Sequence, residues 1–243
     1  MGSYETIMGR MSLRLALFDL DGTIRRVRDP WVHLHEVLGV AEQARDLIPR
    51  WRRGEISYDE WARLDAAFWC GVLRARMVAA LDENPVRGGA RELVGWFTSK
   101  AIPCVGISTG LSIFHEHTAR DLGMDRVICN ELHFDGDVCT GEITINVREE
   151  SKGEIMDEVL AEYGVRAEEV VAFGDGKADI PLFRKAGFGI AICPLHAQVR
   201  ESADYVVEAE PIDGALAIVA SHFRMDGGQV QIRGRGCLSR RRS

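Results

Sequence analysis

Two aspartates, Asp19 and Asp21, have the clearest potential for chemistry in this sequence. They follow the apolar segment 15–18 and come just before Gly22 and Thr23. Such a segment is typical of a buried strand in a parallel sheet, where ligands bind beyond the carboxyl ends of the strands. Two carboxylates there are costly unless a cation or a reaction uses them. One could attack phosphorus while the other moves a proton, and a hard divalent cation would offset the charge.

A simple Asp-Gly turn would also explain Asp21, but later segments favour chemistry. Ser108 and Thr109 follow an apolar run and precede a predicted helix. The Ser108 hydroxyl and nearby backbone N–H groups could hold a phosphoryl oxygen at that helix N-terminus. Lys152 is expected in the first turn of another helix, where the helix dipole disfavours a cation. A phosphate facing Lys152 would account for its position.

A further segment, 170–176, is again an apolar run that ends in Gly-Asp-Gly. Asp175 at the end of this predicted strand could reach the same cation as Asp19. Asp179, four residues later, could orient a metal-bound water. The segment could also be only a turn, but its spacing together with Asp19 and Asp21 predicts a cation site.

The elements that would position these residues alternate between strands and helices. Strands are predicted over 14–18, 102–107, 126–129, 170–173, 189–192 and 205–207, and helices over 90–100, 112–122, 153–163 and 180–186. This alternation predicts an α/β fold, a Rossmann-like, doubly wound parallel sheet with helices on both faces. Residues 131–147 interrupt the rhythm and resemble a small antiparallel β-hairpin.

The chain divides into four predicted regions. The core comprises 13–24 and 86–223, and a helical cap over 25–85 is inserted after the first strand, where it could act as a lid. Residues 1–12 are predicted to be a flexible leader, and 224–243 a disordered basic tail. The cap holds four of the five tryptophans. We expect most of them to form the core of the cap rather than a wall of the substrate site. Trp31, near the hinge, is the expected exception.

Composition narrows the class of protein. The chain has 243 residues, 46% of them hydrophobic, and a formal net charge of −7. The acidic balance argues against a nucleic-acid partner, and no stretch is long and apolar enough to predict a membrane partner. No secretory signal is recognisable, and the six cysteines form no C-x-x-C pair. These features predict a cytoplasmic protein with reduced thiols.

These motifs together resemble those of the haloacid dehalogenase superfamily of phosphohydrolases, in its phosphoserine-phosphatase-like branch. The resemblance implies that Asp19 is the nucleophile and forms an aspartyl-phosphate, and that Asp21 is the general acid and base. It implies that Ser108 and Lys152 hold the phosphoryl group. It also implies Mg²⁺ as cofactor, held by Asp19, by the backbone carbonyl of Asp21 and by Asp175.

Two positions that would grip the substrate differ from that branch. An acid that grips the serine of the substrate is replaced by Arg28, and an arginine of the cap by Asp65. We expect Arg28 and Asp65 either to pair with each other or to bind a substrate with a different charge pattern.

The sequence therefore predicts a Mg²⁺-dependent phosphomonoester hydrolase of a small phosphorylated metabolite, monomeric or homodimeric. A phosphotransferase that passes the phosphoryl group to a second alcohol remains an alternative. A non-catalytic module that binds phosphate or has a regulatory role is a further alternative. It could be a phospho-accepting receiver domain or a degenerate phosphatase.

Overall fold

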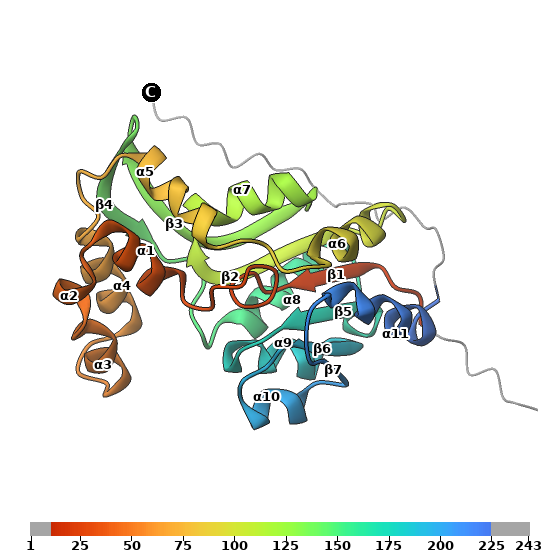
Figure 1. Ribbon diagram of the computed structural model, residues 1–243. Coiled ribbons are helices and arrows are strands. Elements are labelled where there is room, and N and C mark those ends of the chain that lie inside the picture. The colour runs from red at the N-terminus through yellow and green to blue at the C-terminus, as the bar shows by residue number, and fades with distance from the viewer. Residues whose placement is uncertain (1–10, 225–243) are drawn as a thin grey trace, which may run out of the picture.

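A computed structural model describes residues 11–224 of the chain (Figure 1). Its seven-stranded sheet has the order β4-β3-β2-β1-β5-β6-β7, and every neighbouring pair is parallel except β3 and β4. The strands are β1 Leu15–Phe18, β2 Cys104–Leu111, β3 Arg126–Asp135, β4 Val138–Thr144, β5 Val170–Gly174, β6 Phe188–Ile192 and β7 Tyr205–Val207. The predicted α/β fold is confirmed.

Helices cover both faces of this sheet. Side chains of α6, α7 and α11 contribute to the core on one face, and side chains of α8, α9 and α10 to the core on the other. The α-helices are α1 Pro30–Leu38, α2 Ala41–Ala44, α3 Leu47–Arg52, α4 Tyr58–Ala67, α5 Arg74–Val78, α6 Ala90–Thr98, α7 Ser112–Leu122, α8 Lys152–Tyr163, α9 Ile180–Lys185, α10 Ala197–Ser202 and α11 Ala215–His222. The 3-10 helices are η1 Ala79–Glu83, η2 Ala167–Glu169, η3 Lys177–Asp179 and η4 Ile212–Gly214.

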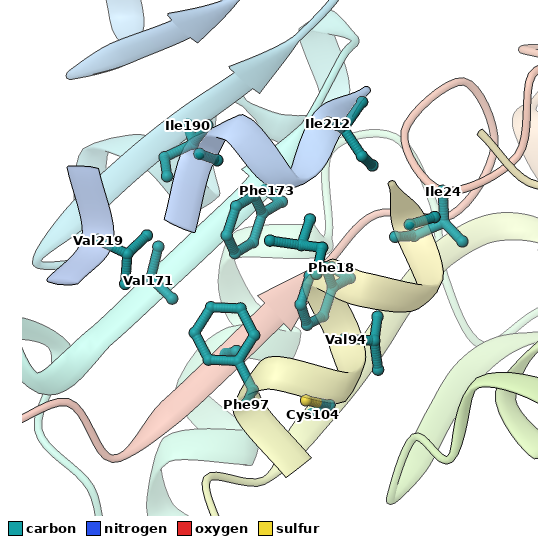
Figure 2. Close-up of a cluster of buried hydrophobic side chains, with 14 of the residues drawn as sticks. Phe18, Ile24, Val94, Phe97, Cys104, Val171, Phe173, Ile190, Ile212 and Val219 are labelled. Atoms are coloured by element: carbon teal, nitrogen blue, oxygen red, sulfur yellow. The ribbon is translucent and has the colours of Figure 1, made fainter. Parts of the chain in front are cut away.

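Strand β1 lies at the centre of the sheet and is buried on both faces. Successive side chains of a strand point to opposite faces, so Leu17 belongs to one core and Phe18 to the other. The Phe18 ring stacks on Phe173 of β5 with centroids 4.8 Å apart, and Phe97 of α6 meets it edge-on (Figure 2). This packing fixes the strand end from which Asp19 projects.

The helices α1 to α5 and η1 lie between β1 and α6, in the region predicted to be the cap (Figure 1). Side chains of α1, α3, α4, α5 and η1 share a buried cluster with the β3–β4 hairpin. Trp31, Trp61 and Trp69 are buried in the cluster that joins these helices to the hairpin. β3 is one continuous strand that pairs with β2 at its start and with β4 at its end. The hairpin is therefore an extension of the main sheet, which carries the cap.

The ends of the described segment pair with each other, since Leu13 N donates to Arg224 O and Arg224 N to Met11 O. Apart from Met11, Ser12 and Arg224, the predicted leader and tail lie outside the described residues. No helix within 11–224 is both long enough and apolar enough to cross a membrane.

Candidate active site

The parallel pairing of β1 with β5 brings two of the predicted carboxylates together. Phe18 is in register with Phe173, and the Asp19 N–H donates to the Phe173 carbonyl at 2.8 Å. Asp19 and Asp175 follow these strands at the same sheet edge, and both are buried. Both line a cavity of about 410 Å³. This is the edge at which ligands bind in such sheets.

Lys152 is the first residue of α8, and its side chain is 2% exposed. Its Nζ donates to Asp19 Oδ1 and to Asp179 Oδ1, both at 2.7 Å. Burial alone would lower the pKa of Lys152, but the two carboxylates outweigh it and the pKa is raised. Lys152 is therefore a fixed cation within the site.

Asp179 shapes the loop after β5. Its Oδ2 accepts from the backbone N–H groups of Asp175 and Gly176, at 3.0 and 2.9 Å. The sequence led us to expect Asp179 to orient a metal-bound water. In the structure its carboxylate lies with those of Asp19 and Asp175, close enough to be a metal ligand itself.

The carboxylates of Asp19, Asp175 and Asp179 form a group whose ligand oxygens lie within 4.8 Å of one another. Burial raises the pKa of Asp19 to about 7 and that of Asp175 to about 8, and repulsion between the carboxylates adds to both shifts. Three buried carboxylates thus exceed the local positive charge. A hard divalent cation such as Mg²⁺ fits this oxygen donor set and would offset the excess.

Asp21 is not part of that group. Its Oδ2 accepts from the Ser108 hydroxyl at 2.8 Å, and Ser108 Oγ accepts from the Gly110 N–H at 2.9 Å. We expected Ser108 at a helix N-terminus, but β2 continues to Leu111 and Ser108 lies within it. The polar group that Ser108 presents here is therefore its own hydroxyl and not a helix end.

Thr109 lines the cavity as well. Its carbonyl accepts from Trp31 Nε1 at 3.2 Å and from Asn130 Nδ2 at 2.9 Å. These bonds tie the strand end both to the cap and to β3.

The structure separates the two residues that we expected to pair or to bind substrate. Arg28 lines the cavity and forms an ion pair with Asp175, and its Nη2 donates to the Cys193 carbonyl at 2.6 Å. Asp65 is 1% exposed and lies 2.9 Å from His35 Nε2. The predicted pair between Arg28 and Asp65 is not formed, because buried His35 takes Asp65.

Apart from Trp31, which we expected as the exception to the cap core, the cavity walls include residues that we did not predict as site residues. The cap contributes the aromatic residues Trp31, Trp51, Tyr58 and Trp61. The walls also contain Ile48, Arg52, Glu149, Lys177, Leu195 and His196. Trp51 stacks on Trp61 with centroids 4.9 Å apart, so these rings serve as both cap core and cavity wall. The sequence signal that could have indicated this aromatic cavity wall was the number of tryptophans in the predicted cap.

Comparison with known proteins places this geometry in context. The family model for haloacid dehalogenase-like hydrolase matches residues 16–184. A phosphoserine phosphatase of Methanocaldococcus jannaschii is 26% identical over 208 residues, which cover 85% of this chain and 97% of that protein. A structure of a phospho-aspartyl intermediate analogue of phosphoserine phosphatase aligns with a TM-score of 0.71 and 24% identity, over 85% of this chain and 99% of the other. The structure of a substrate-bound phosphoserine phosphatase complex aligns with a TM-score of 0.72 and 24% identity. The alignment covers 85% of this chain and 98% of the other.

Proposed function

Because this chain belongs to the haloacid dehalogenase-like hydrolases, we propose that it hydrolyses the phosphomonoester of a small metabolite through an aspartyl-phosphate on Asp19. One observation carries the proposal. A buried carboxylate follows the central strand beside a buried lysine and two further aspartates, and it lines a cavity. The homologues of this chain include phosphoserine phosphatases. Phosphoryl transfer needs such positioning and charge neutralisation.

The reaction takes two displacements. In the first, an Asp19 oxygen attacks phosphorus, the ester P–O bond breaks, and Asp21 gives its proton to the departing alcohol. In the second, Asp21 takes a proton from water, the water oxygen attacks phosphorus, and the bond to Asp19 breaks, which releases inorganic phosphate. Each proton that Asp21 gives is thus recovered within one turnover.

The other residues have supporting roles. Lys152 and Ser108 donate to the phosphoryl oxygens, together with groups of Thr109. Mg²⁺, when bound, would be held by Asp19, Asp175 and the Asp21 carbonyl, with Asp179 beside them, and would stabilise negative charge on the phosphoryl group.

The substrate is proposed to be small. A cavity of about 410 Å³ is at the lower end of the range for ligand pockets, about 300–1,000 Å³. The cavity has a wall of cap tryptophans, and it carries the cation Arg28 where the resemblance implies an acid that grips serine. We therefore propose a phosphoserine-phosphatase-like reaction without assigning serine as the alcohol.

The experiment is phosphate release from phosphoserine, sugar phosphates, phosphoglycolate and nucleotides, with and without Mg²⁺. We expect Mg²⁺-dependent turnover of at least one ester, and its loss in Asp19→Asn. Asp157→Asn on the exposed side of α8 is the matched control and should keep full activity. Release that survives in Asp19→Asn would contradict the aspartyl-phosphate. Transfer to an added alcohol in place of water would indicate a phosphotransferase.

A further inference from the structure

His115 is a buried histidine that the reaction described above does not use. It lies on α7 and its side chain is fully buried. Its Nε2 is 2.8 Å from Asp21 Oδ2 and 3.0 Å from Ser108 Oγ. It thus contacts the acid–base residue and a phosphate-binding residue at once, but it does not itself line the cavity.

The hydrogens available in this cluster determine which group donates. Ser108 has one hydroxyl hydrogen, and it goes to Asp21 Oδ2. An ionised Asp21 carboxylate can only accept. Both contacts of His115 Nε2 therefore require the hydrogen to be on Nε2, where it lies between Ser108 Oγ and Asp21 Oδ2.

The two oxygens of Asp21 are consequently different. Oδ2 accepts from Ser108 at 2.8 Å and lies 2.8 Å from His115 Nε2. Oδ1 is buried and has no hydrogen-bond partner in the part of the chain that the structure describes. An oxygen that already faces two donors is poorly placed to carry a further proton, so the proton that moves is on Oδ1.

We infer that His115 is a positioning residue, which holds Asp21 by Oδ2 so that Oδ1 serves as the acid and base. This inference rests on the proposed phosphomonoesterase function. In the first displacement the Oδ1–H bond breaks and its proton goes to the alcohol oxygen as the ester P–O bond breaks. In the second displacement Oδ1 takes a proton from the attacking water.

The second donor on Oδ2 has a specific use. Ser108 has only one hydrogen, so when it donates to a phosphoryl oxygen it leaves Asp21. His115 then remains as the donor to Oδ2 and keeps the carboxyl from rotating during the reaction. Gly110 makes room for this arrangement, because a Cβ there would overlap both Asp21 Oδ2 and His115 Nε2.

The test varies how much the leaving group needs a proton. An alkyl phosphate releases a basic alkoxide that must be protonated, whereas 4-nitrophenyl phosphate releases a stable anion that need not be. kcat/KM reports the first displacement, in which the leaving group takes the proton, whereas kcat also contains the water step that both esters share. We expect His115→Leu to lower kcat/KM for the alkyl ester by about 10- to 100-fold, the value of one hydrogen bond to a charged group. We expect kcat/KM for 4-nitrophenyl phosphate to change by less than about threefold.

Conservative variants separate positioning from packing. Gln at 115 can place an amide N–H where Nε2 lies, and Asn, being shorter, cannot. His115→Gln should therefore recover most of the alkyl rate, and His115→Asn should not. This pair serves as the test if His115→Leu does not fold. Gly110→Ala, which pushes Asp21 and His115 apart, should reproduce the selective defect.

His117→Leu is the matched control, because His117 is on the same helix and partly exposed. It should leave the ratio of alkyl to aryl rates unchanged. Equal losses of kcat/KM for both esters in His115→Leu, or no difference between Gln and Asn, would overturn the role of His115. Lack of Asp19-dependent release from either ester by the wild-type protein would instead overturn the proposed function, and the inference with it.

Discussion

Charge balance at the end of β1 depends on which cations face which carboxylates. Lys152 bridges Asp19 and Asp179, and Arg28 pairs with Asp175 from the cavity side. Lys152 is buried, whereas the Arg28 side chain is 31% exposed. A partly exposed arginine can leave its partner, so Arg28 would compete with a metal ion bound at Asp175 and could also turn towards an anionic substrate.

Arg28 and Asp65 should therefore respond differently to substitution. We expect Arg28→Ala to raise KM by about tenfold, because a hydrogen bond to a charged group is lost. The same variant should lower the Mg²⁺ concentration needed for half-maximal activity, because Asp175 is freed. Steady-state kinetics at varied ester and Mg²⁺ concentrations measure both effects.

Asp65→Ala provides the contrast, because Asp65 is buried against His35 and does not line the cavity. We expect it to lower the free energy of unfolding by about 1–3 kcal/mol, since a buried histidine loses its partner, and to leave KM unchanged. Urea unfolding gives the stability. An unchanged KM in Arg28→Ala, or a raised one in Asp65→Ala, would reverse these assignments.

At the scale of elements, the turn after β1 places its own requirement on the sequence, in addition to that of the site residues beside it. Gly22 has a φ of +84°, and a Cβ there would overlap the Asp175 carboxylate. The turn therefore needs glycine both for its backbone conformation and for the close approach of Asp175.

Gly22→Ala and Gly39→Ala separate these two requirements. Gly39, at the end of α1, has a φ of +76°, but a Cβ at this position would meet no other atom of the described chain within 4 Å. We expect each substitution to cost roughly 1–2 kcal/mol of stability for left-handed backbone. Only Gly22→Ala should lower kcat, by about 100-fold, because it displaces a site carboxylate. Similar kcat values for the two variants would show that the turn tolerates a shifted Asp175.

Sequence reasoning succeeded for elements whose signals are local. The apolar runs before Asp19 and Asp175 are strands, and the helix that begins at Lys152 is present. It failed where pairing between strands decides the outcome. β2 runs past Ser108 to Leu111 because, after an irregularity in register, Leu111 pairs with Asn130 of β3. That pairing joins residues far apart in sequence and leaves no trace in either segment.

For the whole molecule, the cap helices were predictable but their partners were not. Asp65 is paired with His35 and the tryptophans line the cavity because the cap folds onto the hairpin. Those contacts depend on how two distant parts of the chain meet, and helical periodicity carries no information about that. For the same reason the position of His115 beside Asp21 could not be foreseen.

Two ion pairs join the cap to the segment just before Lys152. Arg148 Nε and Nη2 donate to the two carboxylate oxygens of Asp59 on α4, each at 2.7 Å. Arg52 on α3 similarly binds Glu149, at 3.0 and 3.1 Å. Arg52 and Glu149 also line the cavity. Both pairs are exposed enough for salt to weaken them.

Arg148→Met should therefore loosen the cap while leaving the chemical groups in place. Partly exposed pairs contribute about 0.2–1 kcal/mol, so we expect KM to rise by no more than about fivefold, with kcat and Tm nearly unchanged. Acrylamide should quench tryptophan fluorescence more strongly in the variant, since Trp51 and Trp61 line the cavity. Arg126→Met, which breaks an ion pair between β3 and Glu162 of α8, is the matched control outside the cap. If both variants give the same KM and quenching, the Arg148–Asp59 pair does not hold the cap, and the packing of its aromatic cluster on the hairpin alone keeps the cavity closed.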